Sequence, residues 1–130
     1  MDKVVIDTNV FISGLLFGGK PEQILKSWAK NKFILFISPE FQAEVVNKLQ
    51  NKFKITSNVI DDLIVDLEEQ AKKFIPYINI SLLRDPNDNF LLELVEEAKA
   101  DYLISADKDV LILKEYKGTK IISPSEFLSR

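Results

Sequence analysis

The sequence contains neither histidine nor cysteine among its 130 residues. Without cysteine the chain has no disulfide, no zinc–thiolate site and no thiol nucleophile, which fits a reducing compartment. Without histidine it lacks the usual general base and the commonest zinc ligand. Any proton transfer therefore falls to carboxylates, lysine, tyrosine or a water molecule activated by a metal.

Long apolar runs and strong positive charge are also lacking. No run approaches the roughly 20 residues that span a bilayer, and the start of the chain is unlike a signal peptide. We therefore expect a cytoplasmic protein with no membrane partner. Only four Gly and five Pro interrupt a chain that is 46% hydrophobic, which predicts a single ordered domain over residues 1–130. A net charge of −3 argues against tight nonspecific binding of nucleic acid, but not against a nuclease whose acidic cleft has lysines at its rim.

Helical and extended patterns alternate along the chain. Short apolar segments predict strands at residues 4–6, 33–37, 102–105 and 120–122, and the first of these is β-branched. Amphipathic spacing and capping signals predict helices at residues 11–17, 21–30, 39–52, 57–74, 85–99 and 107–114, and a short terminal helix opened by a capping box at 123–126. This alternation predicts an α/β fold, a three-layer α/β/α sandwich with a central parallel sheet of Rossmann-like type.

Acidic residues fall where such a sheet binds ligands. Asp7 and Asp107 fall just past the carboxyl ends of predicted strands, and the carboxyl ends of parallel strands share one edge of the sheet. Asp109 follows Asp107 closely, while Glu44 and Asp88 lie in the first turns of predicted helices. Carboxylates gathered in a cleft repel one another unless a cation lies between them. Because all these ligand atoms are oxygens, we expect Mg²⁺ or Mn²⁺ and catalysis on phosphate esters.

Each acid also has an ordinary structural interpretation. Asp7 and Asp107 are suited to cap the helices that follow them, and Asp85 to cap the helix that begins at a proline. Glu44 is typical of a solvated helix position. Asp88 heads an apolar helix face, so it needs a partner because an unpaired buried charge is costly.

Three neighbouring polar residues are auxiliary candidates. Asn9 follows the first predicted strand and can orient a carboxylate, and Ser13 lies one helical turn further on. Ser105 ends the predicted strand before Asp107. We add Asp85 to this auxiliary group as a weaker ligand.

Five segments together resemble one known family. They are VVIDTNVF at 4–11, SPE at 38–40 with Glu44, RDPNDNFL at 84–91, ADYLISADKD at 100–109 and ISPSEFL at 122–128. The chain resembles PIN-domain proteins, in particular the small VapC-like toxin components of toxin–antitoxin systems. One departure is visible: the family often has Thr-Gly-Asp where this chain has Ser105-Ala106-Asp107.

The resemblance implies a fold, an activity and partners. It implies a PIN-like domain that cleaves single-stranded RNA with one or two Mg²⁺ or Mn²⁺ ions. Asp7, Glu44, Asp88 and Asp107 would form the catalytic and metal-binding acidic core, with Asp109 as a further metal ligand. It also implies an antitoxin protein as partner and self-association as a homodimer.

Two other functions remain open from the sequence. A PIN-like module could bind RNA or protein without cutting it. A phosphatase could use Asp7 as its nucleophile, although haloacid-dehalogenase phosphatases usually have another acid two residues later, where this chain has Asn9.

Overall fold

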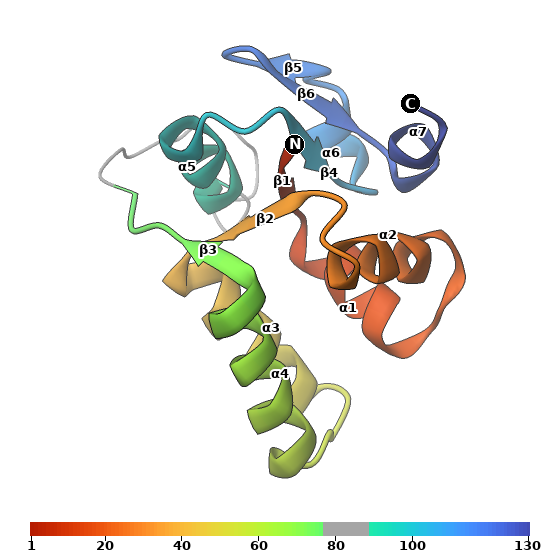
Figure 1. Ribbon diagram of the computed structural model, residues 1–130, viewed down its shortest axis with the longest axis vertical. Helices are drawn as coiled ribbons and strands as arrows, with labels where there is room; N and C mark the ends of the chain where they lie inside the picture. Colours follow the sequence, from red (N-terminus) through yellow and green to blue (C-terminus); the bar gives the residue numbers. More distant parts are fainter. Residues whose placement is uncertain (77–88) are drawn as a thin grey trace.

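A six-stranded sheet forms the centre of the molecule in a computed structural model that describes residues 1–76 and 89–130 (Figure 1). The sequence-based predictions for residues 77–88, including Asp85 and Asp88, lie outside the described residues. The strands are β1 (Lys3–Ile6), β2 (Ile34–Ile37), β3 (Ala71–Lys73), β4 (Tyr102–Ile104), β5 (Glu115–Tyr116) and β6 (Thr119–Ile122). They lie in the order β3-β2-β1-β4-β6-β5, with every pairing parallel except β5 with β6.

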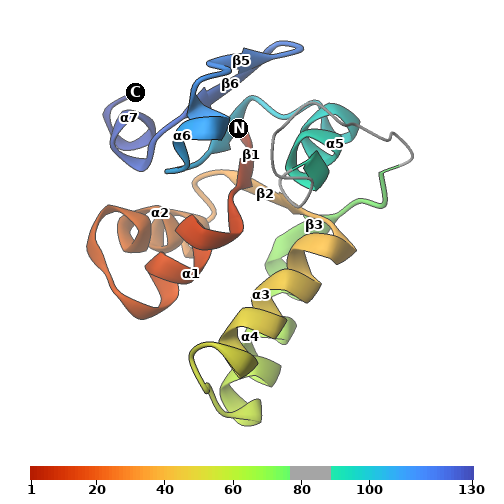
Figure 2. The same cartoon turned by 180° about the vertical axis from the view of Figure 1, so that it is seen from behind.

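Helices cover both faces of this sheet (Figure 1 and Figure 2). They are α1 (Thr8–Leu16), α2 (Gly19–Ala29), α3 (Pro39–Asn51), α4 (Ser57–Gln70), α5 (Asn89–Ala98), α6 (Lys108–Leu111) and α7 (Pro124–Ser129). Alternate residues of a strand point to opposite faces. Accordingly, Val4 and Ile6 pack in one apolar cluster with α1 to α4 and α7, and Val5 packs in the other with α5 and α6. The predicted three-layer α/β/α architecture is confirmed.

Capping residues begin α3 and α7 where the sequence predicts them, whereas α1 and α2 begin at Thr8 and Gly19, earlier than the predicted starts at residues 11 and 21. The Ser38 hydroxyl accepts the Phe41 N–H at 3.2 Å at the start of α3. At α7, Ser123 and Glu126 form both hydrogen bonds of the capping box, each at 3.2 Å. These local contacts satisfy N–H groups that have no partner inside the helix.

The fourth long helix is shorter than its periodicity predicts. The apolar repeat predicts helix as far as residue 74, whereas α4 ends at Gln70 and the chain continues as β3. Ala71 pairs with Leu35 of β2, and the Phe74 N–H donates to the Ile37 carbonyl at 2.9 Å. The free edge of β2 supplies these hydrogen bonds, and the lysines of β3 are typical of a protected edge strand.

The antiparallel strand β5 was also not predicted from the sequence. It forms a hairpin with β6, and both turn residues, Lys117 and Gly118, have positive φ angles of 47° and 88°. A two-residue turn of this kind matches the twist of an antiparallel pair. The sheet is therefore mostly parallel with one antiparallel edge.

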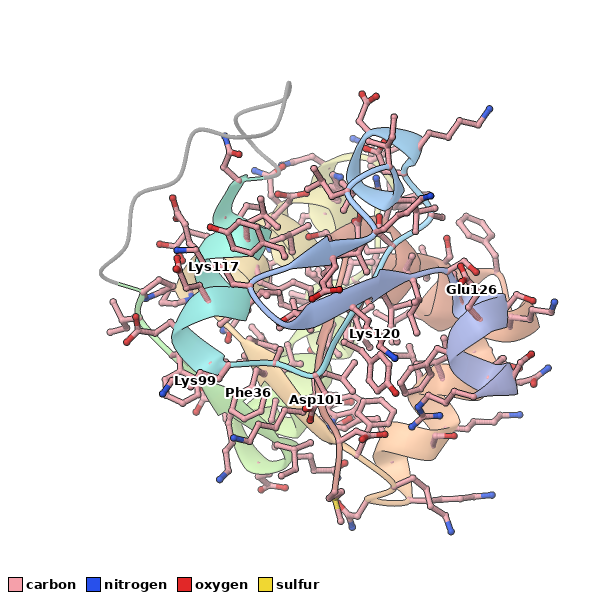
Figure 3. All side chains as sticks on the ribbon, turned by 90° about the horizontal axis from the view of Figure 1, so that it is seen from above. Phe36, Lys99, Asp101, Lys117, Lys120 and Glu126 are labelled. Atoms are coloured by element: carbon pink, nitrogen blue, oxygen red, sulfur yellow. The ribbon has the colours of Figure 1, made fainter. Side chains whose placement is uncertain are left out.

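The amino-terminal side of the sheet is occupied by structural contacts (Figure 3). Asp101, labelled there beside Lys99, accepts the Lys3 N–H at 2.8 Å, and its carbonyl accepts the Lys120 N–H at 3.0 Å. Lys117 forms an ion pair with Glu96 of α5. No helix among residues 1–76 and 89–130 is long and apolar enough to cross a membrane.

Candidate active site

The opposite, carboxyl-terminal side of the sheet holds the predicted acids. Strand order reverses at the centre, because β2 and β3 lie to one side of β1 while β4 and β6 lie to the other. Ligands of open α/β sheets bind at such a switch point. Asp7 follows β1 and Ser105 follows β4, and the Asp7 N–H donates to the Ile104 carbonyl at 2.8 Å.

Asp7 is a buried carboxylate, 5% exposed. One oxygen accepts the Asn9 N–H at 2.9 Å, which caps α1, and the other accepts the Ser105 hydroxyl at 2.8 Å. Burial raises the pKa of Asp7 above its ordinary value of 3.8, and repulsion from Asp107 and Glu44 adds to this rise. The two hydrogen bonds act in the opposite direction on the pKa. Asp7 therefore caps α1 and also belongs to the acidic site.

Ser105 connects Asp7 to the next acid. Its hydroxyl oxygen accepts the Asp107 N–H at 3.1 Å while its hydrogen points to Asp7. Asp107 in turn caps α6 by accepting the Asp109 N–H at 2.9 Å. Ala106 is not among the residues with positive φ, so the alanine found in place of the family's common glycine imposes no left-handed strain.

Aromatic packing fixes α3 against α1 beside this site. Phe41 is 1% exposed and contacts Phe11 edge-on, with 5.3 Å between the ring centroids. Glu44, one turn further along α3, is half-buried and pairs with Lys48 at 3.1 Å. The Lys48 ammonium also donates to the Asn9 side-chain oxygen at 2.9 Å. Lys48 thus joins α3 to the first residues of α1 and partly neutralises the acids.

A cavity of about 490 Å³ brings these groups together. Its lining comes from the ends of β1 and β4 and from α1, α3 and α5: Asp7, Thr8, Asn9, Ala43, Glu44, Asn47, Lys48, Phe90, Leu91 and Asp107. Three of the four predicted catalytic acids, Asp7, Glu44 and Asp107, share it. Ser13 and Asp109 do not line the cavity, and Ser105 reaches it through Asp7.

The donor atoms of the cavity suit a hard divalent cation. Carboxylate, amide and hydroxyl oxygens are the ligands that Mg²⁺ and Mn²⁺ prefer. Thr8 is 1% exposed, and its hydroxyl oxygen has no hydrogen-bond partner among the described residues. A bound cation with its water shell would supply one. In the described part of the chain, however, no three acids stand close enough together to form a metal site by themselves.

Two residues of the cavity carry more weight than the sequence suggested. Thr8 lies between Asp7 and Asn9, but only the structure shows that its hydroxyl is buried and has no partner in the described part of the chain. The sequence does contain a local signal for the ion pair of Lys48 with Glu44, because the two residues are four apart and share one helix face. The contact of Lys48 with Asn9 spans 39 positions and has no such signal.

The substitution Ser105→Ala tests the bridge between the acids. It removes one hydrogen bond from the buried Asp7 carboxylate and an acceptor from the Asp107 N–H. We expect a loss of about 1–3 kcal/mol in the free energy of unfolding, measured by urea denaturation at neutral pH. Ser129→Ala is the matched control, because its hydroxyl bond to Ser125 is exposed. Equal stability of the two variants would show that the bridge does not support Asp7.

Comparisons with known proteins agree with this architecture. The PIN domain profile matches residues 3–109. The uncharacterized protein MJ1680 of Methanocaldococcus jannaschii is 30% identical over 139 aligned positions, which cover 97% of this chain and 89% of the relative. The solved structure of the PIN domain endonuclease Utp24 superposes with a TM-score of 0.53 at 20% identity, covering 93% of this chain and 84% of that one. The chain therefore belongs to the PIN domain family.

Proposed function

We propose that this protein is a metal-dependent endoribonuclease that hydrolyses phosphodiester bonds of single-stranded RNA. The observation that carries the proposal is the burial of Asp7 beside Glu44 and Asp107 in one cavity at the switch point of the sheet. A carboxylate whose pKa is raised by burial, and further by neighbouring acids, is stabilised by a cation. Family membership, and the endonuclease activity stated for Utp24, support a nucleic-acid substrate.

The residues of the cavity would have separate roles in catalysis. Asp7, Glu44 and Asp107 would hold Mg²⁺ or Mn²⁺, and Asp88 stays a predicted fourth ligand. The cation would polarise the scissile phosphate and activate water for attack. The Asn9 N–H and the Ser105 hydroxyl hold Asp7 in a single orientation, which keeps its carboxylate in place for binding. Lys48, whose ammonium is 3.1 Å from Glu44, is placed to contact a phosphate oxygen of the bound strand.

Metal-stimulated cleavage is the direct test. We expect the purified protein to cut a fluorescent single-stranded RNA in Mg²⁺ or Mn²⁺ and to lose this activity on addition of a chelator. Titrated Mn²⁺ should also raise the melting temperature of the protein, because a ligand that binds only the folded state stabilises it. An absence of both effects would contradict the proposal.

A non-catalytic RNA-binding module is the second candidate. It is favoured by the absence of a group of three acids close enough to hold a metal among residues 1–76 and 89–130. RNA binding that Mn²⁺ neither strengthens nor converts into cleavage would support it. The phosphatase alternative has weaker support, because Asn9 occupies the position of its usual second acid and is bonded to Lys48. A phosphorylated Asp7 trapped during turnover would establish it.

The cellular role that we propose is that of a cytoplasmic toxin inhibited by an antitoxin, with self-association as a homodimer. These parts of the proposal rest on the VapC-like sequence segments. We expect expression of the chain to arrest growth and the Asp7→Asn variant to be harmless. Rescue by a protein encoded next to it would identify the antitoxin. Normal growth at high expression of active enzyme would contradict the toxin role.

A further inference from the structure

A second groove lies beside the acidic cavity. It has a volume of about 480 Å³, within the range of about 300–1,000 Å³ typical of ligand sites. One wall is α3, and the remaining lining residues are Ile64 of α4 and Lys73 of β3. Helices α3 and α4 themselves lie side by side in both views (Figure 1 and Figure 2).

The groove adjoins the acidic cavity at α3. Ala43 and Asn47 line both. Ala43 and Asn47 are four residues apart, so they share one face of α3. This face lies between the face of α3 that lines the acidic cavity and the face that lines the groove. Glu44 and Lys48 face the acidic cavity on one side, and Gln42, Val46 and Gln50 face the groove on the other. A strand lying across Ala43 and Asn47 would therefore occupy both.

The side chains of the groove suit a nucleotide. Gln42, Asn47 and Gln50 present amide groups that both donate and accept, as the edges of nucleobases do. The side-chain oxygen of Gln42 is buried and has no hydrogen-bond partner among the described residues. Val46 and Ile64 add apolar surface on which the plane of a base can pack.

The charges of the residues that line the groove also favour a nucleotide. None of the described residues that line the groove is acidic, although the chain as a whole is. Lys73 is the cation at its end, and its contact with Glu68, at 4.0 Å, is an exposed pair of little strength. Its ammonium is therefore available to a phosphate oxygen.

We infer that this groove binds a nucleotide of single-stranded RNA adjacent to the phosphodiester bond held in the acidic cavity, an inference that rests on the proposed function. Gln42, Asn47 and Gln50 contact the base, and Lys73 contacts the backbone phosphate. A segment of a partner protein is the other conceivable occupant. RNA is favoured because the groove shares Ala43 and Asn47 with the cavity where the bond would be cut.

Matched pairs of variants test this assignment. Lys73→Ala is compared with Lys72→Ala, which makes the same charge change on the neighbouring residue, whose side chain does not line the groove. Gln42→Ala is compared with Gln23→Ala, at an exposed position of α2. Melting temperatures confirm that all four variants fold. KM and kcat are measured with the shortest RNA that the wild type cleaves and with a longer RNA that contains it.

The groove variants should raise KM for the longer RNA by roughly 5- to 10-fold and leave kcat unchanged, since they remove binding rather than chemistry. Their KM for the shortest RNA should change little. Lys73→Ala should also reduce the salt dependence of binding by about 0.7 in slope, the value for one contact to a single strand. Lys72→Ala and Gln23→Ala should match the wild type in each measurement.

The outcomes separate this inference from the proposed function. If the wild type cleaves RNA and the groove variants behave like their controls, the groove does not bind the substrate and only the inference falls. If the wild type neither binds nor cleaves single-stranded RNA, both fall. A rise in KM confined to the groove variants and the longer RNA would establish the subsite.

Discussion

Asp7→Asn is expected to reduce RNA cleavage by roughly 10³-fold or more while it raises the stability of the metal-free protein. The amide keeps the shape of the carboxylate and can still accept the Asn9 N–H, but it carries no charge for a cation. It also removes a buried charge that Asp107 and Glu44 repel. We expect a gain of about 1 kcal/mol, or a rise of about 3–5 °C in the melting temperature of a chain of this size. Asp62→Asn, at an exposed position of α4, is the control.

The gain in stability from Asp7→Asn should be absent at low pH and should appear as the pH rises. In the unfolded chain Asp7 loses its proton near its ordinary pKa of 3.8, whereas burial raises its pKa in the folded protein. At pH values below 3.8 the residue is protonated in both states, so wild type and Asp7→Asn should be equally stable. As pH rises through the folded-state pKa, the wild type loses stability that the variant keeps. Thermal melts in a chelator across this interval measure the difference.

Addition of metal should reverse the order of stability. A cation at 100 times its dissociation constant stabilises the folded state by about 2.7 kcal/mol. Mn²⁺ should therefore raise the melting temperature of the wild type above that of Asp7→Asn, which gains little. An unchanged order in saturating Mn²⁺, or full cleavage by the variant, would contradict the assignment of Asp7 as a ligand.

Phe41→Ala is expected to cause the largest loss of stability. The ring is 1% exposed and packs edge-on against Phe11 between α3 and α1. Removal of a buried phenylalanine side chain costs about 3–5 kcal/mol, a large part of the 5–15 kcal/mol typical of a folded domain. Because Phe41 also places the Glu44 turn beside Asp7, activity should fall before the protein unfolds. Urea denaturation and RNA cleavage measured on the same samples compare the two losses.

Two further variants separate packing from mere loss of an aromatic ring. Phe41→Leu keeps much of the apolar volume and should lose less stability than the alanine variant. Phe17→Ala removes a ring that is 69% exposed and packs only edge-on against Phe53, so its effect should be small. A small effect of Phe41→Ala as well would show that α1 and α3 do not depend on this contact.

The sequence by itself was enough to predict the α/β sandwich and the edge of the sheet where the acids lie. These features depend on short-range information, namely short apolar runs for β1 and β4, capping serines at 38 and 123, and acids just past the ends of strands. The parallel pairing of the strands then determines that Asp7 and Asp107 emerge on the same side. The identity of the ligands, with Asp88 and Asp85 outside the described residues, stays a prediction.

Tertiary structure decided the features that join distant parts of the chain. The end of α4 depends on the free edge of β2, which supplies hydrogen bonds that a helical repeat does not reveal. The bond from Ser105 to Asp7 spans 98 positions, and that from Lys48 to Asn9 spans 39. Burial of Asp7 and of the unpaired Thr8 hydroxyl exists only once the strands and helices enclose them. Residue types and local spacing determine where a carboxylate can lie, but its neighbours, and hence its charge state, are set by contacts that only the folded chain creates.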